Sequence, residues 1–308
     1  AALNTTETSN EKETIKNTTG SITWANDNKT IFYSKKEDKT LRVNKIYRHQ
    51  LNSDIKNDIL VFEEKDDQFS TRVYKTKSQE FLIIASRSTL TTEMRFLNAN
   101  TPDEEFKLFA KREKNHEYSI NHFGDSFYIL TNSENSKNFR IMRCSVKDTS
   151  ISSWEEIIPH SKEILIEDIE LFDEYFVISE REKGLVKFRI KKWKANEEFY
   201  LPIEGQTYNA SLGINLDFNS KKLRYNFTSL TNPSSVIEFD MSKKSKNILK
   251  VVEVVDKNFK SSNYESKRVW AISHDGTQVP ISIVKRKETV YSENTPLLLY
   301  GYGSYGIT

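Results

Sequence analysis

Short runs of β-branched and aromatic residues recur at a nearly constant interval along this chain of 308 residues. About four such runs fall within each interval, separated by turns rich in charged residues, Asn, Ser and Gly. Four strands per roughly 40–50 residues is the repeat of a β-propeller blade. The most apolar runs are 51, 46, 48 and 48 residues apart, and they begin at Thr30, Phe81, Phe127, Tyr175 and Leu223. The sequence therefore predicts an all-β propeller of about five blades, each with four antiparallel strands.

The pattern changes after Asn263. Two alternating runs, 267–272 and 279–284, flank Asp275-Gly276, and this pair predicts a hairpin whose tight turn has positive φ at both central residues. A polar linker follows, and residues 296–300 (Pro-Leu-Leu-Leu-Tyr) are predicted to form a fully buried strand of a different sheet. We expect a polar N-terminal segment (1–20), a propeller (21–262) and the beginning of another domain (263–308).

Several motifs near the C-terminus resemble those of a known protein family. They are Val269-Trp270-Ala271, Asp275-Gly276, Val279-Pro280-Ile281-Ser282 and the closing run from Pro296 to Gly306. Together they resemble the junction between propeller and hydrolase in the prolyl oligopeptidase family of serine peptidases, and most of all its oligopeptidase B (protease II) branch. Three further runs are similar to that branch: 17–30, 63–67 and 116–119.

The resemblance implies a seven-bladed propeller that caps an α/β-hydrolase domain and admits only short peptides, which oligopeptidase B cleaves after Arg or Lys. It implies that residues 263–308 are the first strands of that catalytic domain, and that two blades and most of the hydrolase are not part of this chain. No Gly-x-Ser-x-Gly nucleophile motif occurs in the sequence. We therefore expect a gating fragment without the Ser-Asp-His triad, inactive alone, whose partners are short, basic peptides and the hydrolase domain of the same parent chain.

The resemblance also implies roles for two tyrosines. Tyr302 matches the residue whose hydroxyl group donates to the oxyanion hole, where it would stabilise developing negative charge. Tyr305 matches an aromatic residue near the primary specificity pocket. In the prolyl branch that aromatic residue is Phe after Gly, whereas Ser304 precedes Tyr305 here, so the resemblance gives no support for proline binding.

Two other functions have some support in the sequence. The glycines at 301, 303 and 306 fit the dinucleotide fingerprint, but that site needs a helix and a βαβ unit that cannot follow within two residues. A stand-alone propeller that binds peptides or proteins without catalysis is the main alternative. A continuation of the reading frame into a Gly-x-Ser-x-Gly segment would distinguish the peptidase from it.

The counts of charged, histidine and cysteine residues bear on which partners and ligands the chain can bind. The chain has 46 basic and 44 acidic residues, a balance that gives no reason to expect a nucleic-acid partner. Five scattered histidines and a single cysteine, Cys144, predict no metal site, disulfide or cofactor.

The acidic turn 63–67 is expected to be a solvated loop, or else to attract basic peptides. No apolar run is long enough to span a membrane, which predicts a cytoplasmic protein; a periplasmic one stays open if a segment precedes Ala1.

Overall fold

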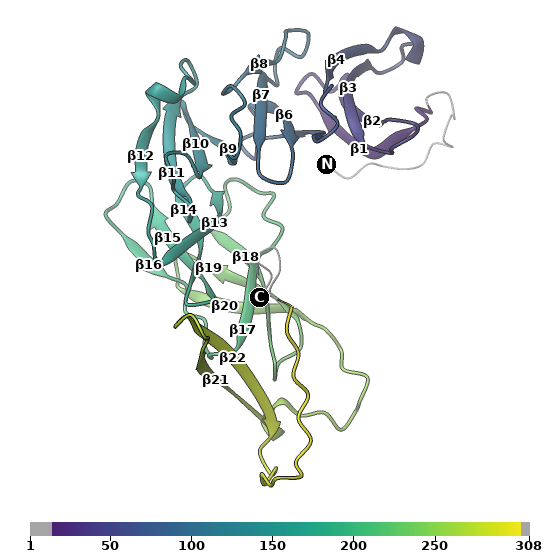
Figure 1. Ribbon diagram of the computed structural model, residues 1–308. Helices are drawn as coiled ribbons and strands as arrows, with labels where there is room; N and C mark the ends of the chain where they lie inside the picture. Colours follow the sequence, from purple (N-terminus) through teal and green to yellow (C-terminus); the bar gives the residue numbers. More distant parts are fainter. Residues whose placement is uncertain (1–13, 303–308) are drawn as a thin grey trace. The chain divides into compact units, whose positions relative to one another are not determined.

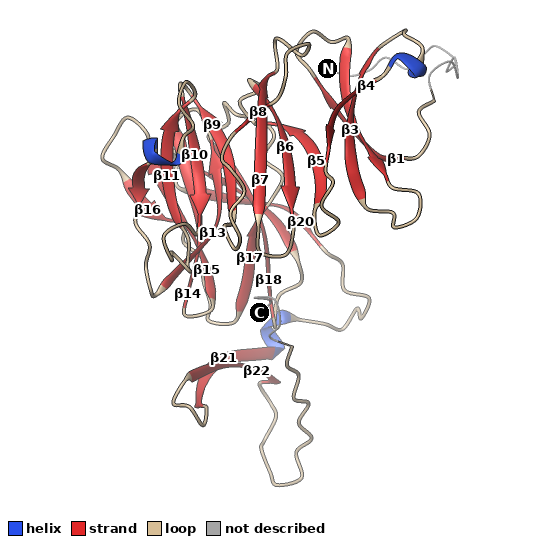
Figure 2. Cartoon of the chain, turned by 45° about the horizontal axis from the view of Figure 1, so that its top comes forward, coloured by secondary structure: helices blue, strands red, loops and turns tan. Residues whose placement is uncertain are grey.

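The described part of the chain, residues 14–302 of the computed structural model, consists mainly of β-strands (Figure 1, Figure 2). It divides into two compact units, one ending at Pro159 and the other beginning at His160. Its only helical segments are single 3-10 turns: η1 (Ile55–Asn57), η2 (Ile151–Ser153) and η3 (Ser261–Asn263).

The first unit contains three four-stranded antiparallel sheets, in which strands that follow one another along the chain also pair. We number the sheets in chain order. Sheet 1 comprises β1 (Thr18–Trp24), β2 (Thr30–Lys36), β3 (Val43–Gln50) and β4 (Ile59–Glu63). Sheet 2 comprises β5 (Ser70–Lys75), β6 (Phe81–Arg87), β7 (Thr92–Asn98) and β8 (Lys107–Leu108). Sheet 3 comprises β9 (Tyr118–Phe123), β10 (Ser126–Thr131), β11 (Arg140–Ser145) and β12 (Glu155–Ile158).

The second unit contains two more such sheets and a two-stranded hairpin. Sheet 4 comprises β13 (Ile164–Leu171), β14 (Tyr175–Glu182), β15 (Leu185–Lys192) and β16 (Glu198–Tyr200). Sheet 5 comprises β17 (Tyr208–Leu212), β18 (Lys222–Ser229), β19 (Ser235–Asp240) and β20 (Ser245–Val251). The hairpin consists of β21 (Tyr264–Ile272) and β22 (Gln278–Arg286).

The second strand of each sheet accounts for the repeat in the sequence. It pairs on both edges, and in β6 and β14 the first six residues are all buried. A strand that is buried on both faces has a continuous apolar run instead of an alternating pattern. The strands β2, β6, β10, β14 and β18 begin within one residue of the five predicted runs. The prediction of four-stranded propeller blades is confirmed.

Within each unit, the cores lie between successive sheets. In the first unit the buried ring of Phe127 lies 4.9 Å from that of Phe81 and 5.2 Å from that of Phe109, centroid to centroid. In the second unit Phe188 of sheet 4 packs in one cluster with Leu223 and other apolar side chains of sheet 5. Such large aromatic side chains contribute most of the apolar area that holds one sheet against the next.

The hairpin forms where it was predicted, but its turn differs. Only Gly276 has positive φ, at 84°, whereas Asp275 does not. The Gly276 N–H donates to the Ser273 carbonyl at 2.9 Å, and the Asp275 carboxylate accepts from the Thr277 N–H at 3.0 Å. The loop is therefore a type I turn followed by a left-handed glycine, the usual longer alternative to the two-residue turn.

The strand predicted at residues 296–300, as part of the sheet of another domain, does not form among the described residues and stays a prediction. These residues have no regular structure, and the side chains of Leu297, Leu298 and Leu299 are 85%, 90% and 81% exposed. A strand needs a neighbouring strand to satisfy its backbone groups, and no described strand pairs with this segment. The predicted limits at residues 20 and 262 stay predictions, although β1 runs across the first of them.

Candidate functional site

Tyr302, the one tyrosine of the predicted site that the structure describes, does not meet other catalytic groups among residues 14–302. Tyr302 is 59% exposed, and no hydrogen bond joins its hydroxyl group to another residue within 14–302. Tyr305 lies outside the described residues. An oxyanion hole needs two or more donors that converge on one point. The described residues alone therefore do not assemble the predicted catalytic site.

The acidic turn after β4 is organised around a buried carboxylate. The Glu64 side chain is only 6% exposed, and Oε2 accepts a hydrogen bond from Arg112 Nη2 at 2.6 Å. Its other oxygen, Oε1, accepts from the Asp66 N–H at 3.1 Å. Glu64 is thus part of an ion pair inside the first unit and does not belong to a solvated loop. Lys65 and Asp67 of the same turn remain exposed.

Besides Glu64, the Arg112 side chain contacts an aromatic ring and a second carboxylate. Its guanidinium carbon lies 3.7 Å from the centre of the Phe69 ring, and Nε lies 3.6 Å from a carboxylate oxygen of Glu93. Burial opposes the charged form of Glu64, but the hydrogen bonds from Arg112 and from the Asp66 N–H outweigh it and hold its pKa below the usual 4.5. The pair therefore stays ionised near neutral pH.

A second arginine fixes the backbone of the same turn. Arg42, from the loop between β2 and β3, donates through Nη1 to the carbonyls of Asp66 and Phe69, each at 2.8 Å. The link between sheets 1 and 2 is therefore clamped by one arginine from sheet 1 and by Arg112 from the link between sheets 2 and 3. We name Arg42, Glu64, Asp66, Phe69 and Arg112 the linker clamp.

The linker clamp was not predicted, although the sequence contains a signal for it. Glu64 and Arg112 are 48 residues apart, the same separation as the blade repeat. Equivalent positions of successive repeats lie side by side in a repeat protein. A search for opposite charges one repeat apart would have found this pair.

Three of the histidines and the cysteine are buried among other side chains. His49 Nδ1 lies 2.6 Å from Asp58 Oδ1, and Tyr33 donates to the other oxygen of Asp58 at 2.6 Å. His122 is buried, with Nδ1 2.9 Å from Ser78 Oγ. Burial raises the pKa of the Cys144 thiol to about 12, which keeps it protonated and unreactive. His274 differs from the others, because it is exposed in the hairpin turn.

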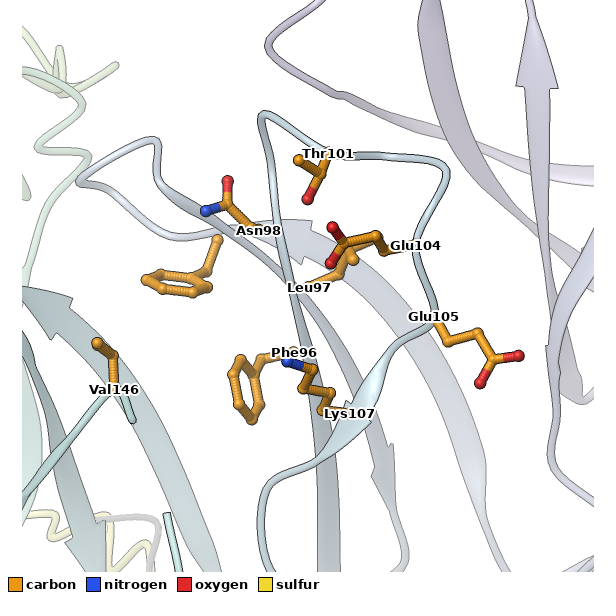
Figure 3. A pocket seen from close by; sticks show the side chains of 9 residues that line it. Phe96, Leu97, Asn98, Thr101, Glu104, Glu105, Lys107 and Val146 are labelled. Carbon is orange, nitrogen blue, oxygen red and sulfur yellow. The ribbon is translucent and has the colours of Figure 1, made fainter. Parts of the chain in front are cut away.

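One surface depression lies on the first unit, with a volume of about 260 Å³ (Figure 3). Phe81, Phe96 and Val146 contribute apolar walls, and Glu104 and Glu105 lie on the loop between β7 and β8. Figure 3 shows the Glu105 side chain pointing away from Phe96 and Val146. None of the residues predicted to act on a substrate lines it.

No group of three or more His, Cys, Asp or Glu side chains between residues 14 and 302 is arranged to hold a metal ion. Over the same residues, no helix has the length and apolar character required to cross a membrane.

Comparison with known proteins gives the same fold assignment as the sheets. Two solved structures of oligopeptidase B are similar, each at 27% identity. The enzyme from Trypanosoma brucei, in a closed form with covalently bound antipain, matches 95% of this chain and 42% of its own with a TM-score of 0.87. The enzyme from Leishmania major matches 96% of this chain and 43% of its own with a TM-score of 0.85.

Curated relatives extend the comparison. Dipeptidyl aminopeptidase BI from Pseudoxanthomonas mexicana is 32% identical over 295 residues, which cover 96% of this chain and 40% of that protein. Protease 2 from Moraxella lacunata is 28% identical over 289 residues, 93% of this chain and 41% of that protein. The chain thus spans about 40% of the length of these relatives.

The family assignment depends on a match to most of the chain. Residues 2–252 match the family described as prolyl oligopeptidase, N-terminal beta-propeller domain. This range contains all five four-stranded sheets and ends just before the hairpin. The chain therefore belongs to the prolyl oligopeptidase family of serine peptidases and carries its N-terminal β-propeller domain.

Proposed function

We propose that this chain is the gating part of a serine oligopeptidase that hydrolyses short peptides after Arg or Lys. The observation that supports this most strongly is the family match over residues 2–252, followed by a C-terminal run that resembles the beginning of the hydrolase domain. The partners would be short, basic peptides and the catalytic domain of the same parent chain, in the cytoplasm. Such a propeller restricts access to a buried site and so limits substrate length.

The chain itself should not hydrolyse peptides. Acyl transfer requires a nucleophile, a base and an orienting acid held together, and the 308 residues contain no Gly-x-Ser-x-Gly motif. In the longer protein, Tyr302 would donate a hydrogen bond to the oxyanion, and Tyr305 would lie near the specificity pocket. The exposure of Tyr302 leaves its hydroxyl group accessible for that role.

The test uses an N-terminally blocked Arg-Arg amide with a fluorogenic leaving group. The purified chain, shown to be folded by circular dichroism, should release no fluorophore and should not react with a serine-directed fluorophosphonate. The longer protein should do both. Turnover by the 308-residue chain that the fluorophosphonate blocks would overturn the proposal.

A second candidate activity has one specific observation in its favour. The relative that is 32% identical is named a dipeptidyl aminopeptidase, and an enzyme of that name removes dipeptides from a free N-terminus. Comparing the blocked amide with the same amide carrying a free α-amino group, both on the longer protein, separates the two. A strong preference for the free amine would replace the endopeptidase proposal with an exopeptidase.

A further inference from the structure

The buried face of β9 begins and ends with a histidine. Along this strand Tyr118, Ile120 and His122 are buried and alternate with partly exposed residues. His116 is also buried and continues the same alternation two residues before the strand. His116 and His122 are only 6% and 2% exposed. The two imidazole rings therefore lie in the interior of the first unit, near opposite ends of one strand.

This face of sheet 3 packs against sheet 2. The His122 ring lies 4.7 Å from the Phe81 ring of β6, centroid to centroid. Its Nδ1 lies 2.9 Å from Oγ of Ser78, in the turn between β5 and β6. Near the other end of β9, the His116 carbonyl accepts a hydrogen bond from the Thr92 N–H of β7 at 2.9 Å. Each histidine therefore lies where sheet 3 contacts sheet 2.

Each ring has one nitrogen next to a hydroxyl group and one buried nitrogen that forms no hydrogen bond of ordinary geometry. His116 Nε2 lies 2.9 Å from Thr131 Oγ1, and its Nδ1 is the other kind. In His122 the roles are reversed, with Nδ1 next to Ser78 and Nε2 unbonded. A neutral ring carries one N–H, whereas a protonated ring must donate through both nitrogens. Protonation therefore leaves each ring with a buried N–H that lacks an acceptor, which is costly.

Aromatic side chains surround the two histidines. The His116 ring lies 5.0 Å from the Tyr118 ring and 6.1 Å from the Trp154 ring, and the His122 ring lies 5.4 Å from the Phe127 ring, centroid to centroid. Burial raises the pKa of Tyr118, so its hydroxyl group stays uncharged. A protonated imidazole in these surroundings loses most of its hydration.

The charged groups near the two rings do not offset this loss. Burial lowers the pKa of His116 and of His122 below the ordinary 6.5. Glu113 faces His116 and favours its charged form, but burial outweighs this attraction. The same holds for the groups that face His122, which are Glu80, Asp125 and the Gly124 backbone. Neither ring forms an ion pair among residues 14–302, whereas His49 lies 2.6 Å from Asp58.

We propose that His116 and His122 make the contact between sheets 2 and 3 a pH-sensitive joint that acid loosens. Above the ordinary pKa of 6.5 both rings are neutral, whether the joint is closed or open, and the packing is intact. As the pH falls below that value, the open form binds protons first, because its rings are in water. Stability is then lost until the lower pKa of the closed form is reached. The joint is independent of the proposed peptidase activity, since it requires no catalytic residue.

The first experiment measures urea denaturation of the 308-residue chain between about pH 8 and pH 5. Below about pH 6.5, each of the two histidines should raise the equilibrium constant for unfolding by up to about tenfold per pH unit. His116→Gln and His122→Asn keep a neutral amide near the bonded nitrogen, so the double variant should lose both contributions. His274→Asn is the matched control and should keep them, because His274 is exposed in the hairpin turn. A rise in the double variant as steep as in the unmodified chain overturns the proposal.

Amide hydrogen exchange locates the effect and covers the case in which the double variant does not fold. In the unmodified chain, a change from about pH 7.5 to pH 5.5 should lower the protection factors of β9, corrected for the intrinsic exchange rate at each pH. The loss should be several-fold greater than in β13, the matched strand, which is also the first of its sheet. Sheet 4, to which β13 belongs, contains no histidine between residues 164 and 200. Equal losses in the two strands, or no loss in β9, overturn the proposal.

Discussion

Glu64 remains charged although only 6% of its side chain is exposed, and the linker clamp explains how. The Arg112 guanidinium group provides the opposite charge, and the Asp66 N–H satisfies the other carboxylate oxygen. A buried ion pair is not by itself strongly stabilising, because desolvation offsets the attraction. Removal of one partner is a different matter, since it leaves an uncompensated charge in the interior.

Loss of Arg112 should therefore cost more than the intact ion pair contributes. Arg112→Gln should lower the free energy of unfolding of the first unit by about 2–4 kcal/mol, measured by urea denaturation, because Glu64 loses its countercharge. Arg143→Gln is the control: Arg143 also pairs with a glutamate at 2.6 Å, but the two side chains are 43% and 67% exposed. It should cost less than about 1 kcal/mol. Equal losses in the two variants would contradict the role of burial.

The same carboxylate predicts a dependence on pH. The folded pKa of Glu64 lies below its usual 4.5, so its charge stabilises the folded state above that pH. This contribution should disappear as the pH falls through the folded pKa. The stability difference between the unmodified chain and Glu64→Gln should therefore shrink between about pH 6 and pH 3. A difference that stays constant over that range would mean that Glu64 does not titrate as the structure indicates.

The two-residue turns between strands show how backbone and packing requirements combine in one element. Lys183 and Gly184 connect β14 to β15, and both have positive φ, at 49° and 77°. This is the type I′ geometry, whose twist matches that of the flanking strands. The positive φ of Gly184 favours glycine, and a Cβ there would also displace the end of the Arg268 side chain.

A pair of glycine substitutions separates these requirements. Gly124, between β9 and β10, has a φ of 62° but open space around a Cβ, whereas Gly184 does not. Gly124→Ala should cost about 1–2 kcal/mol from backbone strain alone. Gly184→Ala should cost more, because the hairpin side chain must move as well. The measurement is chemical denaturation of both variants; a smaller loss in Gly184→Ala would show that Arg268 yields freely.

Elements with a local signal could be predicted, and those that depend on distant partners could not. The second strand of a sheet is buried on both faces, and its continuous apolar run is visible in the sequence. The propeller repeat could therefore be predicted. The start of the first strand, β1, was assigned to the polar segment 1–20, because this strand contains Gly20 and polar residues and its register shifts between Thr18 and Ile22. The strand predicted at 296–300 does not form among the described residues, since apolar character cannot create the neighbouring strand that it requires.

The candidate site was predictable only in part. Resemblance singled out Tyr302, but the sequence did not show that its hydroxyl group meets no other donor among residues 14–302. Glu64 and Arg112 could have been paired by their separation of one repeat.

At the scale of the whole chain, the exposed run near the C-terminus is the main liability. Leu297, Leu298 and Leu299 lie next to one another with at least 81% exposure. Contiguous apolar surface of this kind promotes association. A chain in which all three are serine should scatter less light at high concentration and keep its melting temperature, because the leucines stabilise nothing in the fold.

The control for that variant is Val290→Ser, which removes an isolated side chain that is 87% exposed. It should change neither the light scattering nor the melting temperature, since single exposed apolar residues are normal. If the triple variant melts at a markedly lower temperature, the leucines contact the fold more closely than the structure indicates.

The linker clamp also depends on how many strands lie between Glu64 and Arg112. Glu64 ends one sheet and Arg112 follows the next, with four strands between them. An even number of antiparallel strands returns the chain to the same end of the sheet, whereas an odd number would leave Arg112 at the opposite end. Longer turns within sheet 2 would not separate the two groups, but the loss of one strand would. The 2.6 Å contact therefore requires an even number of strands between Glu64 and Arg112, and the four strands of sheet 2 meet this requirement.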